Sequence, residues 1–334
     1  MIDNDMVFSL WLDFIERDFL KEQFVELVEK RIINGATSNP SIFAQAISSS
    51  PAYKEALEKL AGKTPKEKYE ALALEDIKNA AIALRGVYDE GSEGYISIEV
   101  DPFLAHNTDQ TIEEGRRLFK TVDEPNVMIK IPATEEGYEA MKTLLGDGIP
   151  VNATLVFSPE QARKCLEAMK EGIDEFENTG GERVEAVISV FVSRFDRMLD
   201  PILKAKGLPV ARTGIMNAAK IYNLVQDYQT PCVRTLFAST GVKSDDLPAD
   251  YYIRELYGPH CVNTAPLHTI RAFEAAGAAK PTLPIPEEEI DAYFVRLREA
   301  GVEIDEVRAT LMQEGVQAFE ESFSKLLEEL EDER

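Results

Sequence analysis

The sequence predicts a single (β/α)8 (TIM) barrel, in which eight parallel strands alternate with helices and close on themselves. Short apolar runs alternate with longer amphipathic stretches along the whole chain, which is the pattern of a βα protein. Eight such runs occur, the number that closes a barrel of this type. No low-complexity linker divides the 334 residues, so we assign 1–334 to one domain, with an open doubly wound sheet as the alternative.

The predicted strands are short runs of β-branched and apolar residues, bounded by glycine, proline or polar residues. A strand buried on both faces reads as such a run, because helices cover one face and the barrel interior lies on the other. The candidate strands lie near residues 8–13, 33–38, 96–100, 127–131, 150–155, 185–191, 232–238 and 260–263.

Helical spacing of apolar residues marks the stretches between these strands. Residues 14–31 form the first predicted helix, and residues 52–61 and 66–85 form two more, separated by a turn that ends in Thr64-Pro65. One crossover between strands needs a single helix. We therefore expect residues from about 52 to 85 to be a helical insertion on the outside of the barrel.

The last predicted element is an amphipathic helix over about residues 313–334, with many glutamates beside its apolar stripe. The stripe has to dock on another surface, and we favour the barrel of the same chain over a separate partner. The stripe consists of Val316, Phe319, Phe323, Leu326, Leu327 and Leu330.

The charge balance excludes several classes of partner. Sixty acidic residues against 36 basic ones give a net charge of −24 at pH 7. A surface of this sign repels polyanions, so we expect neither nucleic acid nor a membrane as a partner. A small anionic substrate needs a local cationic pocket to overcome the same repulsion.

The cysteines and histidines carry no metal or disulfide pattern. Three of each are scattered along the chain without the spacing of a zinc site or a disulfide framework, so we predict no metal site. Free thiols suit a reducing compartment, and the chain shows neither a secretory leader nor an apolar run long enough to cross a bilayer. These features predict a cytoplasmic location.

Lys130 is the most informative single residue. It lies near the carboxyl end of a predicted inner strand, Val127-Met128-Ile129-Lys130-Ile131, where α/β barrels keep their chemistry. A lysine is rarely buried unless another group pairs with it or uses it. Loss of solvation leaves part of such an amine neutral and nucleophilic, which suits a Schiff-base lysine. The alternative is a lysine whose stem packs while its ammonium group reaches solvent.

Polar residues recur at the carboxyl ends of six predicted strands, always on one face. Side chains alternate along a strand, so these residues point together into the barrel while aliphatic residues face the helices. A barrel selected only for stability fills such positions with Val, Ile or Leu, which favours catalysis at Lys130. The inward residues are Ser9, Trp11, Asp13, Thr37, Asn39, Ser97, Glu99, Met128, Lys130, Asn152, Thr154 and Ser189.

The two inward carboxylates supply the acid and base that carbonyl chemistry on an amine requires. Asp13 and Glu99 are the candidates for proton transfer to and from the substrate. The alternatives are that Asp13 caps a helix beginning at Phe14 and that Glu99 pairs with a nearby cation.

Other inward side chains suit the remaining parts of a sugar. The amides of Asn39 and Asn152 can orient a dihydroxyacetone-like unit. The hydroxyl groups of Thr154 and Ser189 can hold a water or the imine region.

A local cationic pocket has a candidate after the sixth and seventh strands. Arg194, Lys243 and the hydroxyl of Ser239 together suit a sugar phosphate. The alternative for Arg194 is an ion pair with Asp196 or Asp200.

These residues resemble transaldolase, the class I Schiff-base aldolase family, in its longer bacterial form. The match rests on Gly35-Ala36-Thr37-Ser38-Asn39-Pro40-Ser41-Ile42-Phe43 and on Ile129-Lys130-Ile131-Pro132-Ala133-Thr134, and it extends from about Phe8 to the terminal helix. The resemblance implies a cofactor-free barrel enzyme of the pentose phosphate pathway. It would move a dihydroxyacetone unit from sedoheptulose 7-phosphate to glyceraldehyde 3-phosphate.

The resemblance also implies a role for each site residue. Lys130 would form the Schiff base, Asp13 would act at the cleaved hydroxyl, and Glu99 with Thr154 would manage a catalytic water. The sugar would be bound by Asn39, Asn152 and Ser189, and the phosphate by Arg194.

One departure from the family pattern affects the phosphate site. Many members place an arginine two residues after the serine that follows the seventh strand, but this chain has Gly241 there, and we infer that Lys243 takes its place. The sequence does not settle the oligomeric state, and we expect a monomer or a homodimer. It also leaves two rivals, an aldolase that releases free dihydroxyacetone and a non-catalytic sugar-phosphate-binding barrel.

Overall fold

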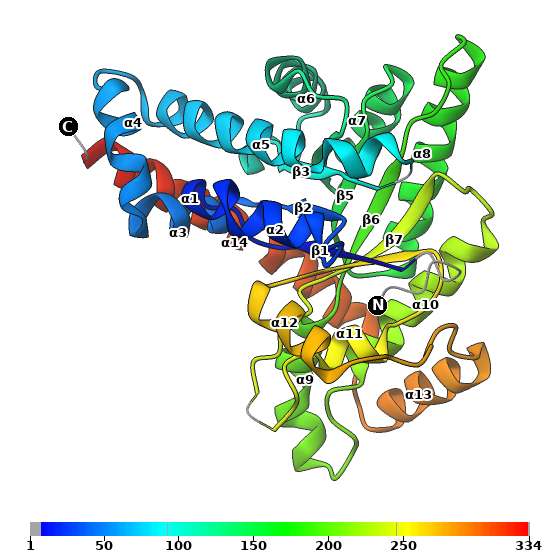
Figure 1. Cartoon of the computed structure of the whole chain (residues 1–334). Coiled ribbons are helices and arrows are strands. Elements are labelled where there is room, and N and C mark those ends of the chain that lie inside the picture. Colours follow the sequence, from blue (N-terminus) through cyan, green and yellow to red (C-terminus); the bar gives the residue numbers. More distant parts are fainter. Residues whose placement is uncertain (1–7, 92, 245, 333–334) are drawn as a thin grey trace.

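Eight parallel strands form a closed barrel, and helices surround it (Figure 1). The computed structural model describes residues 8–91, 93–244 and 246–332. The predicted fold class is confirmed, and each strand end lies within two residues of its predicted position. The strands are β1 Phe8–Leu12, β2 Gly35–Thr37, β3 Ile96–Glu99, β4 Val127–Pro132, β5 Val151–Val156, β6 Ala186–Phe191, β7 Val233–Ala238 and β8 Cys261–Ala265.

Helices fill every connection between these strands and follow the last one. Up to β4 they are α1 Arg17–Lys21, α2 Gln23–Glu29, α3 Pro40–Ser49, the 3-10 turn η1 Pro51–Tyr53, α4 Lys54–Lys59, α5 Pro65–Asp89, the 3-10 turn η2 Pro102–Leu104 and α6 Thr108–Val122. After β4 they are α7 Glu135–Gly146, α8 Pro159–Asn178, α9 Ser193–Ala205, α10 Thr213–Asp227, α11 Tyr251–Glu255, α12 Leu267–Ala276, α13 Glu287–Glu299 and α14 Ile304–Asp332. None of the helices in the described ranges is long and apolar enough to cross a membrane.

The prediction of one helix over residues 14–31 is wrong. The chain forms two short helices, α1 and α2, because the backbone leaves helical geometry at Glu22, with φ −125° and ψ −74°. The first helix begins at Arg17, where the Glu16 carboxylate accepts a hydrogen bond from the amide of Phe19. The spacing of apolar residues does not reveal this one-residue break, because α1 and α2 both bury their apolar residues in the core.

The extra helices between β2 and β3 are present as predicted, with different bounds. In place of a helix over residues 52–61 the chain makes the 3-10 turn η1 and the short helix α4. The helix predicted for residues 66–85 is α5, which Thr64 caps together with Glu67. In Figure 1, α4 and α5 extend to one side of the barrel.

The inside of the barrel is filled by apolar side chains from alternate strand positions, including Trp11, Met128, Val187 and Leu236. Trp11 lies opposite Gly35 of β2, and a Cβ atom at Gly35 would lie 2.6 Å from the indole ring. Glycine is therefore required at Gly35, because the largest side chain of the interior occupies the space where another side chain would stand.

A buried ion pair closes the amino-terminal end of the barrel. Arg234 of β7 points inward with 2% of its surface exposed and pairs with Glu93, the residue that also accepts a hydrogen bond from the hydroxyl of Ser9 at 2.7 Å. The Glu93 carboxylate also accepts from the indole nitrogen of Trp11 at 3.4 Å. A paired and hydrogen-bonded charge is the form in which a barrel interior tolerates an arginine.

The terminal helix α14 lies against the carboxyl ends of the strands. It begins at Ile304 instead of about residue 313, and the predicted positions 333–334 lie outside the described residues. It contacts β5, α3, α5 and α9, so it docks on the barrel of its own chain as predicted. Its Leu311 and Phe319 join the apolar cluster of the barrel interior.

We predict that Arg234→Met lowers the free energy of unfolding by about 3 kcal/mol, because it leaves the Glu93 carboxylate at the barrel end without its cation. Urea denaturation followed by circular dichroism measures the change. The control is Lys59→Met, which breaks an exposed pair with Glu55 and should change stability by less than about 0.5 kcal/mol. Equal shifts for the two variants would contradict the account of the barrel end.

Candidate active site

Lys130 lies at the centre of the polar residues that the sequence predicts to converge. It is 5% exposed, and β4 places it level with Glu99 of β3 and Asn152 of β5. Its Nζ atom lies 3.1 Å from Oε2 of Glu99, donates to the carbonyl of Ser38 at 3.2 Å, and lies 5.5 Å from the ring centroid of Phe319. The ammonium group does not reach solvent, so the alternative of a packed stem with an exposed head is wrong.

Glu99 is the carboxylate closest to this amine. Burial raises the pKa of Glu99 above its ordinary value, while the charge and hydrogen bond of Lys130 act in the opposite direction. The alternative that Glu99 pairs with a cation is confirmed, and the cation is the candidate nucleophile. A buried carboxyl group with this pKa direction can receive a proton from the ammonium group beside it.

Asp13 approaches the same space from the end of β1. The alternative that it caps the first helix is wrong, because Glu16 is the cap. The hydroxyl of Thr37 donates to Oδ1 of Asp13 at 2.7 Å. Burial raises the pKa of Asp13, and the charge of Lys130 and the Thr37 hydrogen bond partly offset that rise.

Two of the predicted sugar-binding residues, Asn152 and Ser189, form a hydrogen-bonded row with Ser97 across three strands. The Ser189 hydroxyl donates to Oδ1 of Asn152 at 2.6 Å, and Nδ2 of Asn152 donates to the Ser97 hydroxyl at 2.9 Å. The buried hydroxyl of Thr154 has no hydrogen-bond partner among the described residues, so a bound molecule can use it. Asn39 starts α3, and its Oδ1 accepts from the amide of Ile42.

The strand alternation used for β5 fails at its end. Leu155 has a left-handed backbone, with φ 58°, at a register shift between Ala153 and Val156. This bulge turns Leu155 into the inner apolar cluster, where the period of two would direct it toward the helices. Leu155 therefore adds an apolar wall beside the Thr154 hydroxyl.

The predicted anion-binding residues are only partly brought together. Arg194 is half-buried, stacks over Phe191 at 5.1 Å, and makes no hydrogen bond or ion pair within the described ranges. Burial lowers the pKa of its guanidinium group. The Ser239 hydroxyl lies 3.0 Å from that of Ser193, whereas the side chain of Lys243 is exposed and contacts none of these groups.

The alternative that Arg194 pairs with a neighbouring aspartate is wrong, because both aspartates have other partners. Asp196 accepts from the amide of Gly214 and the hydroxyl of Tyr252, each at 2.9 Å. Asp200 accepts from the amide of Ala211. The Arg194 guanidinium therefore stays available for an anion.

Helix α14 packs closely against the site at Gly315. A Cβ atom at Gly315 would lie 3.0 Å from Leu155 and 3.4 Å from the guanidinium of Arg194. One turn later, Phe319 presents its ring to Lys130. The sequence marked Phe319 as part of an apolar stripe but gave no sign that the stripe covers the amine.

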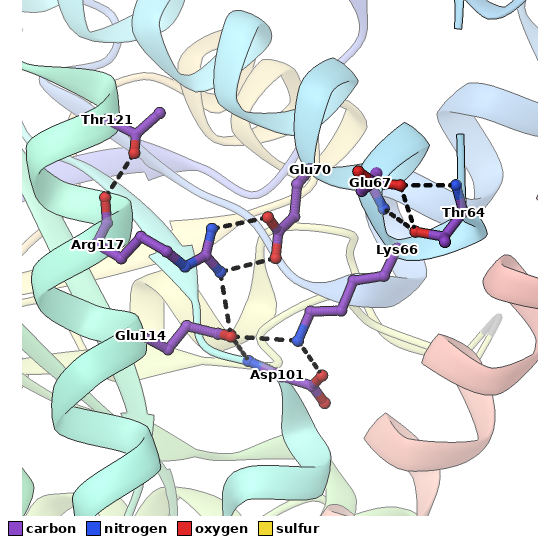
Figure 2. Close-up of polar contacts among 8 residues, drawn as sticks. All are labelled: Thr64, Lys66, Glu67, Glu70, Asp101, Glu114, Arg117 and Thr121. Atoms are coloured by element: carbon purple, nitrogen blue, oxygen red, sulfur yellow. Dashed lines mark hydrogen bonds and ion pairs between the residues drawn. The ribbon is translucent and has the colours of Figure 1, made fainter. Parts of the chain in front are cut away.

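Behind Glu99, a network of charged residues fixes the end of β3 (Figure 2). Lys66 of α5 pairs with Asp101 and with Glu114 of α6, and Glu114 accepts from the backbone amide of Asp101 at 2.7 Å. Arg117 binds both oxygens of Glu70 at 2.7 and 2.8 Å and reaches Glu114 at 3.2 Å. The network holds the residue two positions after Glu99 between two helices, which restrains the direction of the Glu99 side chain.

Comparison with known proteins agrees with this geometry. The family model described as Transaldolase/Fructose-6-phosphate aldolase matches residues 10–330. The chain belongs to this family.

Two relatives in this family match almost the whole chain. A protein named Transaldolase from Helicobacter pylori (strain Shi470) is 45% identical over 321 residues, covering 96% of this chain and 98% of the relative. A protein of the same name from Campylobacter jejuni subsp. jejuni serotype O:6 is also 45% identical, over 97% of this chain and 99% of its own length.

The described part of the chain contains no group of three or more His, Cys, Asp or Glu residues arranged to hold a metal ion.

We predict that Lys66→Met lowers both the free energy of unfolding, by about 1–2 kcal/mol, and kcat, by about threefold or more. The substitution leaves the nearly buried Asp101 carboxylate without a cation and loosens the segment that follows Glu99. Thermal unfolding and steady-state kinetics measure the two effects. The control is Lys63→Met, which removes an exposed pair with Glu67 four residues along the chain and should change neither value. A Lys66 variant that behaves like this control would contradict the role of the network.

Proposed function

We propose that the protein is a transaldolase that moves a dihydroxyacetone unit from a ketose phosphate to an aldose phosphate through a Schiff base on Lys130. The observation that carries the proposal is the buried Lys130–Glu99 pair, with Asp13 at the same carboxyl end of the barrel. The name of the relatives, Transaldolase, supports this type of reaction. The proposed donor is sedoheptulose 7-phosphate, and the proposed acceptor is glyceraldehyde 3-phosphate. The products are erythrose 4-phosphate and fructose 6-phosphate.

The first half of the reaction makes the electron sink. Glu99 takes a proton from the Lys130 ammonium group, and the neutral amine attacks the ketone carbon to form a carbinolamine. The protonated Glu99, acting through a water held by Thr154, returns that proton to the carbinolamine hydroxyl, which leaves as water. The products are a cationic iminium on Lys130 and an ionised Glu99.

The second half breaks and remakes a carbon–carbon bond. Asp13 takes the proton of the hydroxyl group on the second carbon beyond the iminium carbon. The bond between the first and the second of these carbons then breaks and releases the aldose. The electron pair moves onto the iminium, which becomes a neutral enamine. The enamine attacks the acceptor aldehyde, whose oxygen receives the proton back from Asp13. Hydrolysis then frees Lys130.

Different polar groups bind the two ends of the substrate. Asn39, Asn152 and Ser189 bind the hydroxyl groups of the dihydroxyacetone unit. Arg194 and Ser239 bind the phosphate, with Lys243 as a second cation that has to turn inward from its exposed position. The reaction as written uses no cofactor.

The proposal also covers the cellular location and the oligomeric state of the enzyme. We propose a cytoplasmic location, which the three free thiols of Cys165, Cys232 and Cys261 support. The protein acts alone on sugar phosphates or as a homodimer, and its assignment to one domain over 1–334 stays a prediction.

We predict that borohydride reduction in the presence of fructose 6-phosphate fixes a dihydroxyacetone adduct on Lys130. Intact-mass and peptide mass spectrometry locate the adduct. In Lys130→Met the adduct disappears and kcat falls by at least about a thousandfold, because no other group can form the iminium. The control Lys170→Met replaces an exposed lysine of α8, and it should retain both the adduct on Lys130 and the wild-type kcat.

Two other outcomes would replace the proposal. Steady turnover of fructose 6-phosphate without any acceptor aldehyde would identify an aldolase that releases dihydroxyacetone. Binding of sugar phosphate by the folded protein without an adduct or turnover would identify a binding protein.

We predict that Arg194→Met raises KM for phosphorylated substrates by about 10- to 100-fold, because this half-buried guanidinium, which makes no ion pair within the described ranges, binds the phosphate. Adduct formation with unphosphorylated dihydroxyacetone should be unchanged in this variant. Lys243→Met should raise the same KM by less than about fivefold, because exposed charges act weakly. A larger effect at Lys243 than at Arg194 would reverse the assignment.

A further inference from the structure

Two buried threonine hydroxyls lie behind Asp13 and come from the strands on either side of β1. Thr37 ends β2 and Thr264 belongs to β8; they are 2% and 3% exposed. The Thr37 oxygen lies 2.7 Å from Oδ1 of Asp13 and 2.7 Å from the Thr264 oxygen. The three groups form a continuous row across the top of the barrel.

The direction of each hydrogen bond in this row follows from the number of protons. An ionised carboxylate can only accept, so the single proton of Thr37 points to Asp13. The Thr37 oxygen can then only accept from Thr264, whose proton therefore points to Thr37. Both hydroxyl dipoles are aligned toward Asp13, and aligned hydrogen bonds strengthen one another.

The same strands also fix the backbone around the row. The amide of Asp13 donates to the carbonyl of Ala265 at 2.9 Å, directly after Thr264. The Thr240 hydroxyl lies within donating distance of the carbonyl of Thr264, at 2.8 Å, and of Oδ1 of Asn263, at 2.9 Å. Thr264 is thus held in place independently of its own hydroxyl, so a role for that hydroxyl in building the strand is not required.

We propose that Thr264 is a positioning residue for Asp13: through Thr37 it keeps Oδ1 occupied and leaves Oδ2 as the oxygen that exchanges the proton with the substrate. The inference rests on the proposed function, because it assigns no new step. When Oδ2 carries the proton, Oδ1 still accepts from Thr37, so the row keeps one arrangement throughout the cycle. A valine in place of Thr264 would fill the same space in a barrel selected only for stability.

The row also lowers the proton affinity of Asp13. Donors to the ionised form favour that form, and the charged groups that act on Asp13 are Lys130 and Glu99. Cleavage needs the ionised carboxylate as a base. Loss of the Thr264 hydroxyl therefore raises the pKa of Asp13 and moves the acidic limb of the kcat profile to higher pH.

The test is Thr264→Val, with donor cleavage measured as a function of pH and with borohydride trapping of dihydroxyacetone on Lys130 as a measure of an intact site. We expect a loss of about 3- to 10-fold in kcat, an acidic limb at higher pH, and unchanged trapping. Thr264→Ser should restore the wild-type profile. Thr37→Val, which removes the direct bond, should cost about 10- to 100-fold with a larger shift of the limb in the same direction.

The matched control is Thr235→Val in the neighbouring strand β7. Its hydroxyl is as deeply buried but has no partner in the described structure, so its loss should leave the pH profile unchanged. If Thr264→Val does not fold, Thr264→Ala removes the same hydroxyl without adding a methyl group and is measured instead.

Two results separate failure of this inference from failure of the proposed function. Normal trapping in the Thr264 variant together with a wild-type profile, whatever happens to its melting temperature, would overturn the positioning role. Absence of a Lys130 adduct in the wild-type protein would overturn the proposed function itself.

Discussion

The rest of the site depends on one buried ion pair, between Lys130 and Glu99 on adjacent strands. An isolated charge in a barrel interior is costly, so each of the two groups is tolerated only because the other lies 3.1 Å away. The pair also explains the charges behind it, since the Lys66–Asp101–Glu114 network fixes the segment that follows Glu99 (Figure 2). Both the stability of the barrel and the proposed proton transfer therefore require β3 to hold Glu99 close to Lys130.

The two ends of the barrel differ in the partners of their arginine side chains. At the amino-terminal end, Arg234 pairs with Glu93, whose carboxylate also accepts hydrogen bonds from Ser9 and Trp11. At the carboxyl end, the Thr154 hydroxyl and the Arg194 guanidinium have no hydrogen-bond or ion-pair partner among the described residues. The arginine at the carboxyl end can therefore receive an anionic ligand, whereas the arginine at the amino-terminal end already has its carboxylate.

Much of this arrangement follows from period-two reasoning on single strands. Alternation directs Asn152, Ser189 and Ser97 into the barrel interior, and they form one hydrogen-bonded row there. The reasoning failed where the backbone departs from regular geometry, at Glu22 and at Leu155. Neither break changes the apolar pattern, so the sequence carries no signal of it.

The sequence by itself determined the barrel and placed Lys130, Asp13 and Glu99 together inside it, because alternation along a strand is a local property that neighbouring residues reveal. Only the tertiary structure decided which groups meet across the barrel: Thr264 behind Asp13, Phe319 over Lys130, and Gly315 beside Arg194. These contacts join strands or helices far apart in the chain, and their register depends on barrel closure and on the path of α14. Local patterns do not encode that register, because it is set by the packing of all the elements together.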